Sequence, residues 1–496
     1  MFVHLTERSN ARSVTQTPGY KVVGAGADPH DVRVPAPTRR TLLGAGLASV
    51  SVAAGLTACD AEAPAADPTP TSSPSSTPTA ATDSASPSAS AAATVPTIPD
   101  FDETDWESVR AQFPLDPAMA QFAAFVLSPH TAQVDAAIDF HRGRLARDTE
   151  GTLLEGFDLE NAVRRAAADH SGGTPGQYAL TDSTTMGIAT MYGGLALSAD
   201  DEVLSTTHDF FSTEDSLRLL TKRTGATVKR VTLYDLPWQT SVDEMVSRLV
   251  AGLTSRTKVV AVTWVHSSTG VRLPINEISE AIDGRALLCV DGVHGFAAVD
   301  VDLPDLGCDF LSAGTHKWLF GPRGTGILWG RDWQPLTELI PSFSGPDEGA
   351  RLSPGGYHAF EHRWALDQGF AFHQKVGRTA AVQRTVEQAS QLKQGLAGAK
   401  GIRVVTPADP EVSAGIVCLD VEGLPPGNGV YELVSRASWR ARRRTRSRTS
   451  ASAPASSPRP SRWMRRSRRS PDWSDRLGSW PPAPTTTPPT LATTRS

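Results

Sequence analysis

Residues 312–326 read SAGTHKWLFGPRGTG, and the interpretation of the whole chain starts from this stretch. Lys317 lies between an apolar run that ends near residue 314 and a glycine-rich turn that begins at residue 321. A lysine amine becomes nucleophilic at neutral pH when it is partly desolvated or lies near other cations. Glycines allow the backbone to approach a bound molecule closely. The stretch therefore predicts a reactive amine at Lys317, and the alternative is a surface lysine beside a Gly-Pro turn.

Short apolar runs alternate with amphipathic segments from about residue 101 onward, as is typical of α/β proteins. The expected strands are residues 176–182, 202–208, 227–234, 257–266, 286–295, 308–316 and 324–330. The expected helices are residues 117–128, 134–148, 184–197, 211–225, 242–254 and 275–283. We therefore predict an α/β fold with a mostly parallel sheet, in which ligands bind at the carboxyl ends of the strands.

Asp291 and His294 follow the apolar run ALLCV, at the end of an expected strand. A carboxylate in this position can accept a hydrogen bond from the protonated ring nitrogen of pyridoxal phosphate (PLP), which keeps the ring an electron sink. His294 lies three residues further on, within reach of the phenolic oxygen of such a ring. The alternative for Asp291 is that it caps the next helix.

The segment TDSTTMG, residues 181–187, lies between an expected strand and an expected helix. Hydroxyls and backbone amides at the first turn of a helix form an anion site, which suits a phosphate group. Any helix cap rich in serine and threonine has the same appearance, so this segment carries weight only together with the others.

The five segments STTMG, DFF, HSSTG, DGVH and GTHKWLFGPRGTG occur in the order found in class V aminotransferases, and the chain resembles this PLP-dependent family from about residue 112 to about residue 434. The resemblance implies PLP as cofactor and the type I fold of PLP-dependent transferases. It also implies a large domain with a mostly parallel sheet, a smaller α+β domain, a homodimer, and a small-molecule amine or amino acid as substrate. Within the family, residues 316–322, HKWLFGP, most resemble the epimerase-like branch.

Carried over position by position, the resemblance implies that Lys317 is catalytic and forms the Schiff base with PLP. Phe210 matches the aromatic residue that stacks on the ring, and Ser267 matches a position that is often Asn. The implied cofactor contacts are Thr184 and Thr185 at the phosphate, Phe210, Ser267, Asp291 at the ring nitrogen, His294 at the phenolic oxygen, His316 near the phosphate, and Lys317. Residues 361–364, EHRW, are expected to line the substrate side.

The family pattern breaks in the last part of the chain. No cysteine follows Cys418, so the persulfide chemistry of the desulfurases is not expected. The strand that presents an arginine to the substrate carboxylate in family members has no counterpart here. Residues 436–496 contain 15 arginines but no Val, Ile, Phe or Tyr. We interpret them as a frameshifted, disordered tail behind a truncated small domain; the alternatives are a genuine basic tail or a nucleic-acid-binding segment in which Trp and Arg alternate.

The first part of the chain resembles an export signal. Arg39 and Arg40 precede a short stretch rich in Gly, Ala and Ser, and residues 56–59, LTAC, resemble a lipobox. We predict a twin-arginine-like lipoprotein signal, lipidation at Cys59, and a tether on the outer face of the cell membrane. The long stretch before the arginine pair suggests a start codon upstream of the true one. The alternative is a disordered N-terminus with a chance arginine pair.

Charge and cysteine content argue against a nucleic-acid-binding, a disulfide-stabilised and a metal-binding protein. The formal net charge is −5, but the tail holds 15 of the 48 basic residues and only two of the 53 acidic ones. The acidic remainder argues against nucleic acid as a partner of the body. Four scattered cysteines form neither a disulfide framework nor a zinc motif, and we expect no metal. Cys289 and Cys418 lie in apolar runs and are expected to be packing residues.

These observations predict six regions and one activity. The regions are a signal region (1–59), an Ala/Ser/Thr/Pro linker (60–100), the N-terminal part of the small domain (101–150), the large PLP-binding domain (151–350), an incomplete small domain (351–435) and the tail (436–496). The expected activity is that of a PLP-dependent aminotransferase, epimerase or lyase acting at the α carbon of an amino acid or related amine. The alternative is a catalytically inactive, membrane-tethered lipoprotein that keeps the fold as a binding module.

Overall fold

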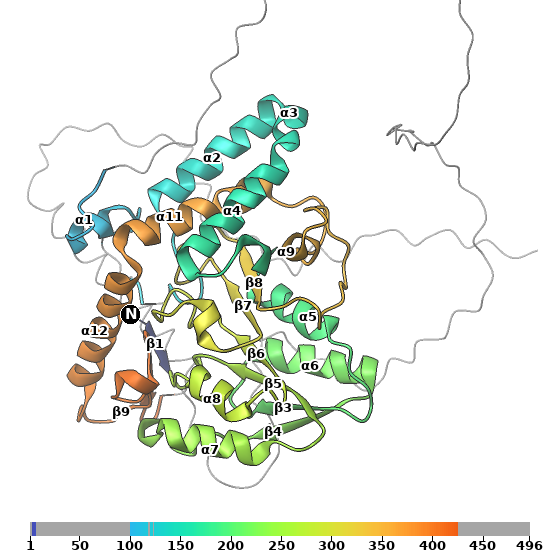
Figure 1. Cartoon of the computed structure of the whole chain (residues 1–496). Helices are drawn as coiled ribbons and strands as arrows, with labels where there is room; N and C mark the ends of the chain where they lie inside the picture. Colours follow the sequence, from blue (N-terminus) through green and yellow to red (C-terminus); the bar gives the residue numbers. More distant parts are fainter. Residues whose placement is uncertain (1, 6–99, 118–119, 123, 425–496) are drawn as a thin grey trace, which may run out of the picture. The chain divides into compact units, whose positions relative to one another are not determined.

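The seven expected strands form one sheet in the order β2-β8-β7-β6-β5-β3-β4 (Figure 1). The computed structural model describes residues 2–5, 100–117, 120–122 and 124–424. β8 runs antiparallel to both of its neighbours, and the other pairs are parallel. The strands are β2 (Tyr178–Thr181), β3 (Glu202–Thr206), β4 (Thr227–Val231), β5 (Thr257–Thr263), β6 (Leu287–Asp291), β7 (Phe310–Gly314) and β8 (Gly326–Gly330). The predicted α/β fold with a mostly parallel sheet is confirmed.

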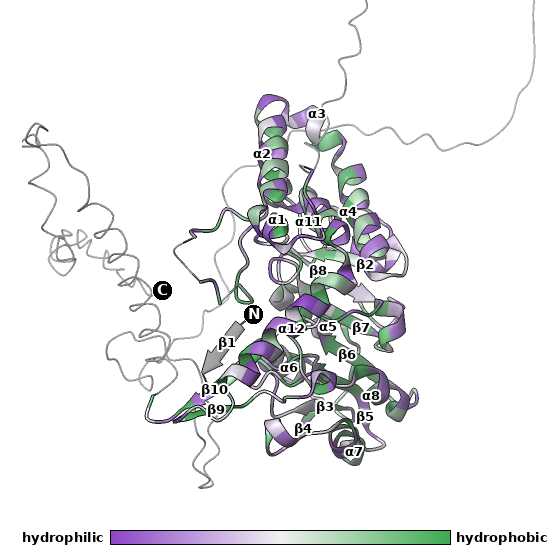
Figure 2. Cartoon of the chain, turned by 90° about the vertical axis from the view of Figure 1, so that its left-hand side faces the viewer, coloured by the Kyte–Doolittle hydropathy of each residue, from purple (hydrophilic) through white to green (hydrophobic). Residues whose placement is uncertain are grey.

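Helices cover both faces of this sheet because its strands carry apolar side chains on both sides. Val260 and Val290 belong to one buried cluster together with α4, α7 and α8, whereas Ala261 and Cys289 belong to another with α5 and α6. These helices are α4 (Gly156–Ser171), α5 (Thr184–Gly194), α6 (Phe211–Thr224), α7 (Val242–Gly252) and α8 (Ile275–Ile282). In Figure 2 the central strands are mostly green, whereas the surface helices carry both colours.

The parallel strands end at one common edge of the sheet, and this edge positions the candidate site. Thr263 pairs with Asp291, and Asp291 pairs with Ser312, so the ends of β5, β6 and β7 lie at the same level. The antiparallel β8 begins at this edge, where Gly326 pairs with Gly314. Residues that follow these strand ends are therefore brought close together, as expected for an α/β sheet.

A second sheet has the order β1-β10-β9 and packs against α12. β1 pairs in parallel with β10, so the backbone of residues 2–5 lies beside residues 416–419. The strands are β1 (Phe2–Leu5), β9 (Ile402–Val404) and β10 (Ile416–Val421). The remaining helices are α1 (Trp106–Ala111), α2 (Ala132–Arg147), α3 (Thr149–Leu154), α9 (Glu348–Arg351), α10 (Phe360–Trp364), α11 (Leu366–Val376) and α12 (Arg378–Leu396), with 3-10 turns at Pro175–Gln177, Pro237–Gln239, Leu303–Leu306 and Pro410–Val412.

The helix predicted at residues 117–128 is wrong for the residues that are described there, which form turns and irregular chain. Phe125 is buried in the main core, and its ring lies 5.8 Å from that of His294. Ser128 donates to the carbonyl oxygen of His316 from both its amide (3.0 Å) and its hydroxyl (2.9 Å). Phe125 thus anchors the segment on the core, whereas Phe122, Val126 and Leu127 are exposed.

Several predictions lie outside the described residues, namely the arginine pair, Cys59, most of the linker and the tail. Cys289 and Cys418 are fully buried, in agreement with a packing role. Among the described helices, none is both long enough and apolar enough to cross a membrane.

Candidate active site

One cavity of about 240 Å³ lies at the carboxyl ends of the parallel strands. It brings together all eight residues predicted to contact the cofactor. Six further residues of the lining were not predicted as cofactor contacts, namely Val126, Ser183, His208, Ser212, Thr263 and Val293. The lining residues are Val126, Ser183, Thr184, Thr185, His208, Phe210, Ser212, Thr263, Ser267, Asp291, Val293, His294, His316 and Lys317.

Lys317 lies three residues beyond β7, in a turn that the local backbone fixes. The amide of Phe320 donates to the carbonyl of Lys317 (3.2 Å), and the amide of Gly321 donates to the carbonyl of Thr315 (2.9 Å). Phe320 takes a positive φ of 61°, which is uncommon for a residue other than glycine. Burial lowers the pKa of Lys317, and the charge of Asp291 acts in the opposite direction. This is the environment in which a lysine amine becomes a nucleophile.

Asp291 is the last residue of β6, and its side chain is only 1% exposed. Its Oδ1 accepts a hydrogen bond from the amide of Val293 (3.1 Å). Burial raises the pKa of Asp291 to about 6, whereas this hydrogen bond and the positive charge of Lys317 act to lower it. No helix directly follows Asp291: residues 293–298 form hydrogen-bonded turns, and the next helical element begins at Leu303, so the bond from Val293 caps a turn and not a helix.

His294 is held in one tautomer by Trp318. The indole N–H of Trp318 donates to Nδ1 of His294 (3.2 Å), so a neutral His294 carries its proton on Nε2. Burial, together with the charge of Lys317, holds the pKa of His294 well below its ordinary value. His294 is therefore an uncharged hydrogen-bond donor on the cavity wall.

The first turn of α5 forms another side of the cavity. The Ser183 hydroxyl accepts from the amide of Met186 (3.2 Å), which caps the helix. Oγ1 of Thr184 accepts from the amide of Gly314 (2.7 Å), which ties the helix start to the end of β7. The amides of Thr184 and Thr185 take no part in these bonds. They are donors at the positive end of the helix dipole, where anions bind.

His316, Phe210 and Ser267 complete the predicted set. Nδ1 of His316 lies 3.1 Å from the carbonyl of Thr325, and burial lowers the pKa of this histidine. Phe210 is 40% exposed and precedes the first residue of α6. The carbonyl of Ser267 accepts from the thiol of Cys418 (3.4 Å).

His208 was missed by the sequence analysis although it belongs to the same motif as Phe210. Its ring stacks on Tyr234 at 4.0 Å with an angle of 10° between the planes. Nε2 of His208 is buried and has no hydrogen-bond partner in the part of the chain that the structure describes. Burial lowers the pKa of His208 to about 3, so this ring is uncharged at neutral pH.

The expectation that residues 361–364 line the substrate side is wrong, because none of them reaches the cavity. Arg363 is 4% exposed and pairs with Glu160 (3.3 Å) and Asp182 (3.4 Å). Trp364 is buried as well. The positive charge of Arg363 is thus paired with two carboxylates of the protein and does not face the cavity.

The family model for class V aminotransferases matches residues 163–435, which is more than half of the chain. This chain belongs to the class V aminotransferase family. The cofactor that membership in this family indicates is pyridoxal 5'-phosphate, as predicted. The match includes both Asp291 and Lys317.

For two curated relatives, the similarity to this chain extends over most of the relative's length. The isopenicillin N epimerase of Streptomyces clavuligerus is 28% identical over 360 residues, which cover 68% of this chain and 88% of the relative. The isopenicillin N epimerase of Amycolatopsis lactamdurans is 26% identical, with 65% and 86% covered. A probable cysteine desulfurase of Haemophilus influenzae is 29% identical but covers 49% of this chain and 57% of its own length.

Two solved structures of PLP-binding or cysteine desulfurase proteins have a similar fold. A mutant of C-DES with glycine covalently linked to its PLP cofactor gives a TM-score of 0.62 at 20% identity, covering 66% of this chain and 90% of C-DES. The cysteine desulfurase of Thermococcus onnurineus NA1 gives 0.59 at 19% identity, covering 67% and 86%. These likenesses support the type I fold.

The residues of the cavity fit PLP in chemical type. A buried carboxylate suits a protonated ring nitrogen, because the cation offsets the cost of burying the charge of Asp291. The helix start at Thr184 suits a phosphate, and His294 offers an N–H to an oxygen. Lys317 supplies an amine whose pKa is already lowered by burial.

Proposed function

We propose that this protein is a PLP-dependent enzyme acting at the α carbon of an amino acid or related amine, with Lys317 as the residue that binds the cofactor covalently. The observation that carries the proposal is that the partly buried Lys317 and the buried Asp291 line the same cavity at the carboxyl ends of the strands and interact through their charges. The family membership of the chain supports it.

The residues of the site have separate roles in this proposal. When bound, the cofactor supplies an electron sink for negative charge that develops at the α carbon of the substrate. Lys317, once released from the cofactor, accepts the proton from that carbon, which a lowered amine pKa favours. Asp291 keeps a ring nitrogen protonated. His294 donates from Nε2, and Phe210 offers its exposed face to the ring.

Three reaction types follow from these roles, namely transamination, epimerisation and elimination. Similarity over most of the length of two isopenicillin N epimerases favours epimerisation of an amino-acid centre. A panel of amino acids in D₂O separates the possibilities. Deuterium at the α carbon with inversion indicates epimerisation, release of an oxo acid without ammonia indicates transamination, and release of an oxo acid together with ammonia indicates elimination.

Borohydride reduction of the PLP-loaded protein, followed by peptide mapping, tests the covalent role of Lys317. The expected result is an added cofactor mass on Lys317 and none in Lys317→Ala. Lys393 provides an internal control, since it too is buried and its pKa is lowered to about 8 by burial. Its amine, however, donates to Pro407, Ala408 and Ser413. Label on Lys393 alone, or no label in folded protein, would favour the inactive lipoprotein.

We also propose that the protein is a homodimer, in which an apolar surface on the segment after β8 forms the interface. Leu339, Ile340, Phe343 and Tyr357 are 43–79% exposed, and the rings of Phe343 and Tyr357 lie 6.1 Å apart. An exposed apolar group of this size is typical of an interaction site. Light scattering should show a dimer for the wild type and a monomer for the Phe343→Glu, Tyr357→Glu double variant. A monomeric wild type would refute this part.

For localisation, we propose export through the arginine pair and anchoring through a lipid on Cys59. This rests on the sequence of residues 38–59. Fractionation of cells that express the wild type, Cys59→Ala and an Arg39→Lys, Arg40→Lys double variant tests it. We expect the wild type in the membrane fraction, the cysteine variant released from it, and the arginine variant retained in the cytoplasm. Wild type found only in the cytoplasm would refute export.

A further inference from the structure

Asp182 occupies an unfavourable position for a site that binds an anion. It follows β2, precedes the Ser183 cap of α5, and lies two residues before Thr184. Its side chain is 43% exposed. A carboxylate at a helix start interacts well with the helix dipole but repels an anion bound at the same place. The charge of Asp182 therefore has to be neutralised if a phosphate is to bind at Thr184 and Thr185.

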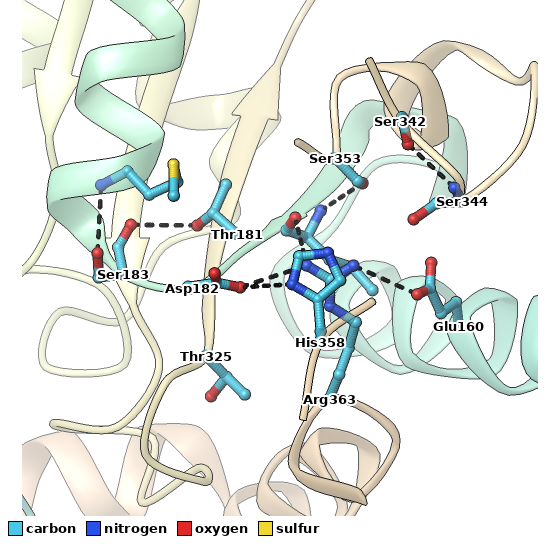
Figure 3. A network of polar contacts seen from close by, with 12 residues as sticks. Glu160, Thr181, Asp182, Ser183, Thr325, Ser342, Ser344, Ser353, His358 and Arg363 are labelled. Carbon is cyan, nitrogen blue, oxygen red and sulfur yellow. Dashed lines mark hydrogen bonds and ion pairs between the residues drawn. The ribbon is translucent and has the colours of Figure 1, made fainter. Parts of the chain in front are cut away.

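Two cationic or ionisable side chains converge on this carboxylate, as Figure 3 shows. Nη2 of Arg363 and Nδ1 of His358 each lie 3.4 Å from Oδ1 of Asp182. The pKa of Asp182 is lowered by the hydrogen bond from His358, although partial burial acts to raise it; the charges of His358 and Arg363 lower it further. His358 comes from the loop before α10, and Arg363 from α10 itself.

Arg363 also fixes the position of the backbone next to Asp182. It donates to the carbonyl of Leu180 (3.4 Å) and to the Glu160 carboxylate of α4 (3.3 Å). The amide of Leu180 donates to the hydroxyl of Ser353 (2.8 Å). The end of β2 is thus held by the segment 353–363. The start of α5 is held from the other direction by the Thr184 bond to β7.

We propose that Arg363, together with His358, is a positioning residue for the cofactor phosphate, acting through Asp182. It neutralises the carboxylate and holds the first turn of α5 where its amides face the cavity. Neither residue lines the cavity, so we expect neither to touch a cofactor bound there. This inference rests on the proposed function, since it requires PLP in this cavity with its phosphate at Thr184.

Binding of PLP and of pyridoxal, which lacks the phosphate, to the apo-protein tests the role. Arg363→Met should weaken PLP about tenfold, within the roughly 5–150-fold range typical of coupled sites, but pyridoxal less than about twofold. Removing the carboxylate as well, in Arg363→Met with Asp182→Asn, should recover most of the loss. Arg378→Met is a matched control, because Arg378 pairs with Asp300 and Asp302 away from the cavity and should leave the PLP-to-pyridoxal ratio unchanged.

Equal weakening of both ligands by Arg363→Met would overturn the proposal and leave Arg363 with a purely structural role. If that variant does not fold, Arg363→Lys replaces it, with a smaller loss for PLP alone expected. Hydrogen exchange of residues 180–187 in the apo-protein gives a readout that needs no cofactor. Faster exchange there in Arg363→Met supports the positioning role, and unchanged exchange contradicts it. Absence of PLP binding in the wild type would instead refute the proposed function.

Discussion

Replacing Asp291 by Asn should stabilise the apo-protein at neutral pH and lower its affinity for PLP. The pKa of the buried carboxyl is raised to about 6 from the ordinary value of 3.8. Well below pH 3.8 the group is protonated in both the folded and the unfolded chain. As the pH rises, the unfolded chain ionises first, so stability falls until the folded protein also ionises near pH 6.

A shift of about two units costs the folded apo-protein about 3 kcal/mol at pH 8 and roughly half of that at pH 5. The Asn side chain stays neutral and avoids this cost. The predicted gain in the free energy of unfolding therefore grows between pH 5 and pH 8. In the PLP-loaded protein the gain should shrink or reverse, because a protonated ring nitrogen stabilises the carboxylate of the wild type.

Urea unfolding of both proteins at pH 5 and pH 8, with and without PLP, measures these differences. Asp209→Asn is a matched control, because the Asp209 carboxylate already accepts hydrogen bonds from Ser205, Thr206 and Thr263. That variant should lose stability at both pH values. Two results for the Asp291→Asn apo-protein would refute the reasoning. One is a free energy of unfolding at pH 8 no higher than that of the wild type, and the other is a gain of the same size at pH 5 and pH 8.

Three further changes test the packing around the site, each by urea unfolding. Gly349→Ala should lose about 1–3 kcal/mol or more, since its Cβ would lie 2.3 Å from the carbonyl oxygen of Tyr178; wild-type stability would contradict the close approach. Trp318→Phe should lose about 1–3 kcal/mol by leaving Nδ1 of His294 buried without its donor; no loss would show that this hydrogen bond is not formed. Phe125→Ala should lose about 3 kcal/mol, whereas a loss below about 1 kcal/mol would mean that the segment does not pack on the core.

The sheet and the cavity could be predicted because local sequence signals and topology agree there. Most strands of the sheet are apolar runs, and each predicted site residue lies at or after the end of one. Parallel topology then places these ends together without any knowledge of long-range contacts. This is why Thr184 was assigned to the same site as Asp291 and Lys317 from the order of the motifs, although it lies more than a hundred residues before both.

The errors concern residues whose role depends on a distant partner. Arg363 was assigned to the substrate side, whereas its partners Glu160 and Asp182 lie 203 and 181 positions away in the sequence. Residues 117–128 have enough apolar residues for a helix, but apolar content alone fixes neither a helix nor burial, since Phe125 of this segment packs on the core while Val126 and Leu127 are exposed. His208 was passed over because Phe210, in the same motif, matched the stacking position.

The charges around the cavity explain why a buried arginine outside it matters. Among the described lining residues, Lys317 is the only lysine or arginine, and it is committed to the cofactor in the proposed function. The pKa values of His208, His294 and His316 are all lowered by burial, so these rings add no positive charge at neutral pH. A phosphate, with roughly 1.5 to 2 negative charges, must then be held by helix amides and hydroxyls. Such neutral donors are weaker than a cation, so an unpaired carboxylate beside them would weaken the binding of an anion. In the role proposed above, Arg363 and His358 remove this penalty by neutralising Asp182.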